Sequence, residues 1–206
     1  MTTEEWAQTL AVSVEDTAPA IENYTEPCPR SAREIATRVV ILQGVIAVAY
    51  EVDAEPVIEW LCEQGVWDQV SPREQAFLLG SEVTDEQRNR LRWHQEAEWA
   101  LLWAIGHVES LGLPTQGCDT QRLVDEIVPP LGSEINAFLD SATLRPPGEL
   151  LAEDDRTYDL WCYATSAVRK GEPLPADLRW WVLYERRYAF EWLDELQDWD
   201  EVTCDA

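Results

Sequence analysis

The chain has 206 residues, of which 46% are hydrophobic and 11 are tryptophan, so it can bury the core of one ordinary globular domain. Its formal net charge of −25 comes from 15 basic and 40 acidic residues, which is the wrong sign for binding nucleic-acid phosphates or an anionic membrane surface. We therefore expect neither nucleic acid nor a membrane among its partners.

The first predicted segment is an N-terminal arm over residues 1–29. It lacks helical periodicity and contains three prolines, so we expect it to be only partly ordered, followed by a helical domain over residues 30–206. Ser31 and Glu34 form a capping box, which marks a helix start. Apolar residues then recur at helical spacing: Ile35, Val39, Leu42, Ile46 and Ala49.

The middle of the chain predicts three further helices. A short helix over residues 55–63 should stop at Gly65, and a second capping box, Ser71 with Glu74, should start a helix that ends near Leu79. Thr84 with Gln87 predicts a long helix to about residue 110. Its part from 97 to 108 is apolar on nearly every side, which indicates a central position.

Four more helices are predicted after the turn at residues 114–117. They cover about 119–128, 133–142, 149–169 and 178–196, and prolines stand near several of their ends. Strand-like alternation is weak everywhere. We therefore predict an all-α fold, a single domain of about eight helices with two central apolar helices at 97–108 and 178–196.

The last predicted helix has a carboxylate inside its apolar face. The face consists of Leu178, Trp181, Val182, Tyr188, Ala189, Trp192, Leu193 and Leu196. Glu185 falls in the middle of this stripe, where an unpaired charge would be costly. We predict that Glu185 is buried and paired with an arginine, with Arg145 and Arg38 as the leading candidates.

Familiar catalytic and targeting signals are missing from the sequence. We find no phosphate-binding glycine loop, no nucleophile elbow, no secretory signal and no apolar run long enough to span a membrane. His94 and His107 belong to no metal motif and are expected at the surface or its boundary. The five cysteines are widely spaced, which indicates free thiols in a reducing cytoplasm. Cys62 and Cys162 should be inert thiols in the core.

The candidate site residues are charged side chains in apolar surroundings. They are Glu96, Arg145, Glu149, Asp155, Glu185, Arg186 and Asp200. They can be an internal ion-pair network that joins helices, or the wall of a polar pocket with acid–base or metal-binding carboxylates. The sequence assigns no catalytic role to any of them, and we expect no metal and no cofactor.

Ordered motifs along the chain resemble the uncharacterised bacterial family known as domain of unknown function 4272. The motifs that carry the resemblance are Ser71-Pro72-x-Glu74, Trp93-x-x-Glu96-Ala97, Ala142-x-Leu144-Arg145, Glu185-Arg186-x-x-Ala189-x-x-Trp192-Leu193 and Trp199-Asp200-x-Val202. The resemblance implies a small cytosolic helical protein and no particular reaction. Trp161 and Arg187 stand where the family pattern has histidine, which argues against histidine-based catalysis.

The favoured function is that of a non-enzymatic acidic interaction protein, for instance an immunity-type inhibitor of a basic toxin. One alternative is an enzyme that uses carboxylates and a divalent metal on a small phosphorylated molecule. Another is the binding of a small apolar ligand in a tryptophan-lined cavity. Trp199 among acidic residues has the composition of an interface hot spot, but a buried Trp199 would instead make the C-terminal segment a structural clasp.

Overall fold

A computed structural model describes residues 27–174 and 177–204 of the chain. The predicted arm therefore falls almost entirely outside the described residues. Within them the fold is all-helical, as predicted, and residues are arranged in eight α-helices with no strand. None of these helices is long and apolar enough to cross a membrane.

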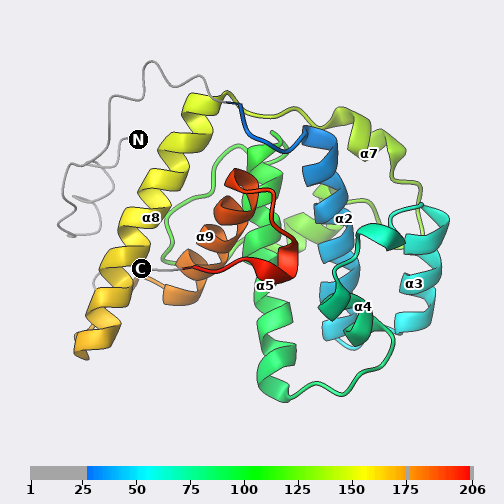
Figure 1. Cartoon of the computed structure of the whole chain (residues 1–206), viewed down its shortest axis with the longest axis horizontal. Coiled ribbons are helices and arrows are strands. Elements are labelled where there is room, and N and C mark those ends of the chain that lie inside the picture. Colours follow the sequence, from blue (N-terminus) through cyan, green and yellow to red (C-terminus); the bar gives the residue numbers. More distant parts are fainter. Residues whose placement is uncertain (1–26, 175–176, 205–206) are drawn as a thin grey trace.

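Helix α5 (Asp85–Ala104) lies at the centre of the molecule (Figure 1). It packs against α2 (Ala32–Ala49) on one side and α9 (Trp180–Asp194) on the other, and α8 (Pro147–Lys170) packs on α9. The shorter helices α3 (Ala54–Glu63), α4 (Pro72–Leu78) and α7 (Asn136–Ser141) surround α2. The remaining elements are short: α6 (Thr120–Arg122), a π-helical turn (Leu123–Ile127) and 3₁₀ turns at Trp67–Gln69 and Trp199–Glu201.

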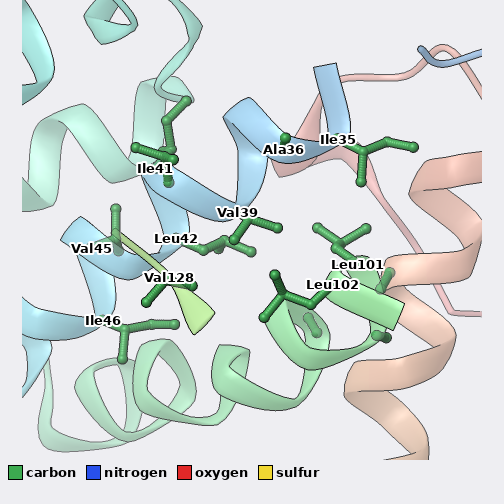
Figure 2. Packing of buried hydrophobic residues seen from close by; sticks show 14 of the residues in the cluster. Ile35, Ala36, Val39, Ile41, Leu42, Val45, Ile46, Leu101, Leu102 and Val128 are labelled. Atoms are coloured by element: carbon green, nitrogen blue, oxygen red, sulfur yellow. The ribbon is translucent and has the colours of Figure 1, made fainter. Parts of the chain in front are cut away.

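The apolar core lies mainly between α2 and α5. Residues 35–46 of α2 are all buried, so α2 is as central as the two helices that the sequence pattern favoured. Figure 2 shows Leu42 of α2 facing Leu101 and Leu102 of α5, with Val128 beside them. A smaller apolar cluster joins α8 to α9: Leu160, Trp161, Ala164, Leu178 and Leu183.

The helix starts predicted from capping residues are accurate because they depend on local hydrogen bonds, whereas the helix predicted from residue 133 begins only at Asn136. Capping boxes form at Ser31, Ser71 and Thr84, and the side chain of Asp119 caps α6. The predicted end of the long helix near residue 110 is wrong, because α5 ends at Ala104 and Gly106 takes a left-handed conformation with φ of 81°.

Several predicted burials are also wrong. Trp181 is 46% exposed, and Leu196 is 74% exposed because α9 ends two residues before it. The thiols of Cys62 and Cys162 were predicted to lie in the core, but Cys62 is exposed and Cys162 is half-buried. A helical stripe wider than the helix–helix contact leaves its edge residues at the surface.

Candidate functional site

Charged side chains from four helices converge inside the molecule. Helix α5 contributes His94, Glu96 and Glu98, α9 contributes Glu185 and Arg186, α2 contributes Arg38 and α4 contributes Glu74, and all seven are buried. Buried ionisable groups in such number are uncommon unless each one is paired. The partners of these side chains therefore decide which of them are structural.

Glu185 is fully buried, as predicted, but its partner is a histidine. Its Oε2 lies 2.7 Å from Nδ1 of His94, and its Oε1 has no hydrogen-bond partner. The predicted pairing with Arg145 or Arg38 is wrong because other groups occupy both arginines. The prediction that His94 lies at the surface is wrong too, whereas His107 is half-buried against Phe138, as expected of a boundary residue.

Arg38 pairs with Glu74, and both side chains are buried. Glu74 also accepts hydrogen bonds from the backbone N–H and the hydroxyl of Ser71, at 3.1 and 2.8 Å, as the carboxylate of the capping box. Burial alone would raise the pKa of Glu74, but Arg38 and Ser71 together lower it below its ordinary value. The ionised form of Glu74 is therefore stabilised. Glu74 in turn holds Arg38 along one edge of the guanidinium group.

Glu98 is the anomalous member of the cluster. It is fully buried, and neither of its carboxyl oxygens has a hydrogen-bond partner. Burial raises the pKa of Glu98 well above its ordinary value, and the charge of Arg38 only partly offsets this. The environment therefore favours the neutral acid and leaves its polar atoms unsatisfied.

Arg186 and Glu96 hold the loop that follows α5. Arg186 donates to the carbonyls of Leu111 and Gly112 at 2.7 and 2.8 Å, and its Nε lies 4.0 Å from Oε2 of Glu96. The other Glu96 oxygen accepts the backbone N–H of Cys118. Burial raises the pKa of Glu96, and Arg186 partly opposes that shift. The pair therefore has the contacts of a structural ion pair.

The remaining predicted candidates do not join the cluster. Arg145 donates to the carbonyls of Trp103, Val108 and Glu109 at the end of α5, and its ion pair with Glu149 is partly exposed at 3.1 Å. Asp155 lies on α8, where its pKa is raised mainly by burial and secondly by the negative charge of the neighbouring Asp154. The seven candidates are thus spread over several places, and only Glu96, Glu185 and Arg186 lie in the buried cluster.

Trp199 and Asp200 form a clasp that fastens the C-terminal segment to α4. Trp199 is 4% exposed, with its ring centroid 4.8 Å from Tyr188, 5.6 Å from Trp192 and 5.8 Å from His94. The carboxylate of Asp200 accepts from the hydroxyl of Ser71 and the backbone N–H of Arg73, both at 2.8 Å. The hot-spot interpretation of Trp199 is therefore wrong, and the clasp alternative holds.

Trp199 lines two cavities. The first, which we call the His94 cavity, has a volume of about 200 Å³ and is lined by His94, Phe77, Tyr188 and Trp199 among others. The second, the Arg38 cavity, has a volume of about 500 Å³ and is lined by Arg38, Trp192 and Trp199 among others. Because Glu185 occupies Nδ1 of His94, Nε2 is the ring nitrogen left for a ligand in the first cavity.

The side chains of two arginines that line the His94 cavity, Arg73 and Arg90, lack a carboxylate partner among the residues that the structure describes. Glu74 and Asp200 also line the cavity, but Glu74 pairs with Arg38, and Asp200 accepts from Ser71 and the backbone of Arg73. Arg90 donates to the hydroxyl of Tyr184 at 2.6 Å and makes no ion pair. Both guanidiniums are therefore available to an anionic group that enters the cavity.

A separate acidic group joins α8 to α9. Asp154 forms an ion pair with Arg187 at 2.5 Å, and Arg187 also pairs with Glu191. Burial, with Asp194 nearby, raises the pKa of Asp154 to about 7 despite Arg187. Across residues 27–174 and 177–204, no group of three or more histidine, cysteine or acidic side chains has an arrangement that could hold a metal ion.

The sequence interpretation missed His94, Glu98, Arg38 and Glu74. His94 and Glu98 are spaced i, i+4 and share a helix face with Leu101 and Ile105, so the pattern did carry a signal of burial. Glu74 was recognised only as a capping residue, and Arg38 only as a possible partner of Glu185. Their pairing depends on how α4 docks on α2, which no local pattern encodes.

The comparison with known protein families gives one match. The chain matches the family described as "Domain of unknown function (DUF4272)" over residues 1–202, which includes the segment treated above as an arm. No curated protein and no solved structure matches the chain.

Proposed function

Because the chain belongs to the DUF4272 family, whose function is unknown, we propose from the site that the protein binds a small anionic molecule with one planar ring in the His94 cavity. The observation that carries the proposal is the pair Arg73 and Arg90, whose side chains have no carboxylate partner among the described residues and line a cavity that contains a buried imidazole. This develops the hypothesis of a ligand in a tryptophan-lined cavity.

The size of the cavity limits the ligand. A volume of about 200 Å³ lies below the usual range for drug-sized ligands. An apolar cavity of about 150 Å³ is nevertheless enough for benzene. Phe77, Tyr188 and Trp199 supply aromatic walls for such a ring.

The charges favour an anionic group on the ligand. The guanidinium of Arg73 is exposed and forms no hydrogen bond or ion pair with another described residue, although its backbone N–H donates to Asp200. A carboxylate or phosphate on the ligand can accept from these guanidiniums in bidentate geometry. His94, oriented by Glu185, provides a further polar contact within the cavity.

Nuclear magnetic resonance titration with benzoate, phenyl phosphate and neutral benzamide tests the proposal. We expect both anions to shift the resonances of His94 and of the Trp199 indole, and to bind about tenfold more tightly than benzamide, since a charged hydrogen bond contributes about 1.5–3 kcal/mol. Arg73→Gln should weaken the anions, whereas Arg122→Gln, at an exposed ion pair elsewhere, should not. Equal binding of benzoate and benzamide, or no binding by either, would contradict the proposal.

The acidic interaction protein remains a second candidate function, supported by the net charge of −25. The burial of Trp199 removes the aromatic anchor first suggested for it. Co-expression with any basic toxin encoded beside its gene tests the immunity-type form: protection from the toxin, with an association rate that falls steeply with salt, would support it. The metal-dependent enzyme has no specific observation in its favour among the described residues.

We also propose a cytoplasmic location. All five cysteines are free thiols, which is typical of proteins in reducing compartments. Fractionation of the native host, followed by immunoblotting, tests this proposal.

A further inference from the structure

Arg38 uses only a small part of its hydrogen-bonding capacity. It is 4% exposed, and the single hydrogen bond that the structure records for its guanidinium is from Nη2 to Glu74. Its Nε is buried without a partner. A guanidinium has five N–H donors, and buried donors without acceptors are rare and costly. The unused donors of Arg38 therefore have no acceptor among the described residues, although the charge of Arg38 also acts on the buried carboxyl group of Glu98.

The Arg38 cavity is the place where such an acceptor can enter. Its volume of about 500 Å³ lies within the range of small-molecule sites. Two buried indoles form its walls, each covered by an arginine: Arg38 lies 4.6 Å from the ring centroid of Trp199, and Arg30 lies 3.8 Å from that of Trp192. Because these contacts fix the position of Arg38, a ligand meets a donor that is already oriented.

The opening of the same cavity carries negative charge. Asp68 and Asp198 line it and are exposed, and neither accepts a hydrogen bond or forms an ion pair within the described part of the chain. Glu34 also lines the cavity, but its carboxylate is committed to the cap of α2 through Ser31. Asp68 and Asp198 are therefore the two lining acids that no hydrogen bond or ion pair among the described residues holds, and the cation of Arg30, which also lines the cavity, interacts with the charge of Asp198.

We propose that the Arg38 cavity binds an α-amino acid as its zwitterion, with the carboxylate on the unused donors of Arg38 and the ammonium group near Asp68 and Asp198. A simple carboxylate would meet Arg38 but would be repelled by the acidic entrance. A simple amine would be attracted at the entrance but would meet a buried cation inside. A zwitterion matches both charges. Ile41, Val70 and Trp192 also line the cavity and offer apolar surfaces for the side chain of the bound amino acid.

The proposal is tested on the full chain with glycine and L-leucine as probes. Acetate and 4-methylpentanoate are the matched probes without the amine, and methylammonium is the probe without the carboxylate. In a nuclear magnetic resonance titration, we expect the amino acids to shift the side-chain amides of Gln69 and Gln75, which line the cavity. They should bind about tenfold more tightly than the probes that carry only one of the two charges.

Variants of the acidic residues at the entrance, and of the Arg38–Glu74 pair inside the cavity, provide a further test. Asp198→Asn and Asp68→Asn should each weaken amino-acid binding several-fold, while Asp125→Asn, at an exposed acid elsewhere, should leave it unchanged. Arg38→Gln would leave the buried carboxylate of Glu74 without its cationic partner, so it is combined with Glu74→Gln, which keeps the pair neutral and hydrogen-bonding. Once its melting curve shows that it folds, this double variant should lose amino-acid binding.

The inference is wrong if acetate binds as tightly as glycine, if neither amino acid shifts the cavity resonances, or if the folded double variant binds them normally. These outcomes are independent of benzoate binding in the His94 cavity, because the probes and the reporting residues differ. Failure of one site therefore leaves the other unaffected.

Discussion

The two halves of α5 have opposite chemistry. From Leu101 onward, α5 packs against α2 with apolar side chains that fill the core without polar partners to satisfy (Figure 2). One turn earlier, His94, Glu96 and Glu98 bury charge against α9, α2 and the C-terminal clasp. The apolar half gains stability from burial alone, whereas the charged half depends on specific partners and leaves several atoms without any. The charged half therefore contributes to stability only through its paired groups, and its unsatisfied polar atoms oppose folding.

The largest expected effect is at Glu185. Glu185→Ala leaves His94 buried without its partner and should reduce the free energy of unfolding by about 3–5 kcal/mol. The melting temperature should then fall by roughly 10 °C. Thermal unfolding followed by circular dichroism measures this. An unchanged melting temperature would mean that the pair contributes nothing to folding, and would favour a purely functional role.

A cavity made in the apolar half should reduce the free energy of unfolding by a comparable but smaller amount than Glu185→Ala. Leu102 is fully buried, and Leu102→Ala should cost about 3 kcal/mol through lost burial and the cavity left behind. Leu79→Ala is the matched control because Leu79 is 68% exposed, and it should change stability very little. Chemical denaturation of both variants checks the difference, and equal losses would contradict the assigned core.

Replacement of Glu98 by an apolar residue should raise the stability of the fold instead of lowering it. Since its carboxyl group is fully buried without a hydrogen bond, Glu98→Met replaces an unsatisfied polar group by an apolar one of similar size. We expect stability to rise by about 1–3 kcal/mol, the desolvation cost of such a group. The same denaturation measurement applies. A loss of stability would show that Glu98 has a polar partner, such as a bound water, which the charged half of α5 needs.

A further prediction is a pH dependence of stability at the α8–α9 contact. The folded-state pKa of Asp154 is raised from 3.8 to about 7, chiefly by burial, so the folded protein binds this proton more tightly than the unfolded chain does. Stability from this group is therefore lost as pH rises from about 4 to about 7. Asp154→Asn should flatten the fall in melting temperature between these pH values, and Asp125→Asn should not. An unchanged profile would contradict the assigned shift.

The burial of some candidate site residues could be predicted from the sequence, but their partners could not, for a physical reason. The burial of Glu185 followed from its place in an apolar stripe, because a helix face repeats every three to four residues. Its partner did not follow, because His94 stands 91 residues earlier and meets Glu185 only through the packing of α5 on α9. The same holds for Arg38 and Glu74, which are 36 residues apart.

The sequence by itself determined the helical class, the family and the helix starts at Ser31, Ser71 and Thr84. These depend on interactions within one turn of helix, which neighbouring residues encode directly. The tertiary structure alone decided that Trp199 is buried as a clasp and that it lines two cavities. It also decided that Arg38 keeps unused donors, because the burial and partners of a side chain are set by helices that the sequence does not place next to one another.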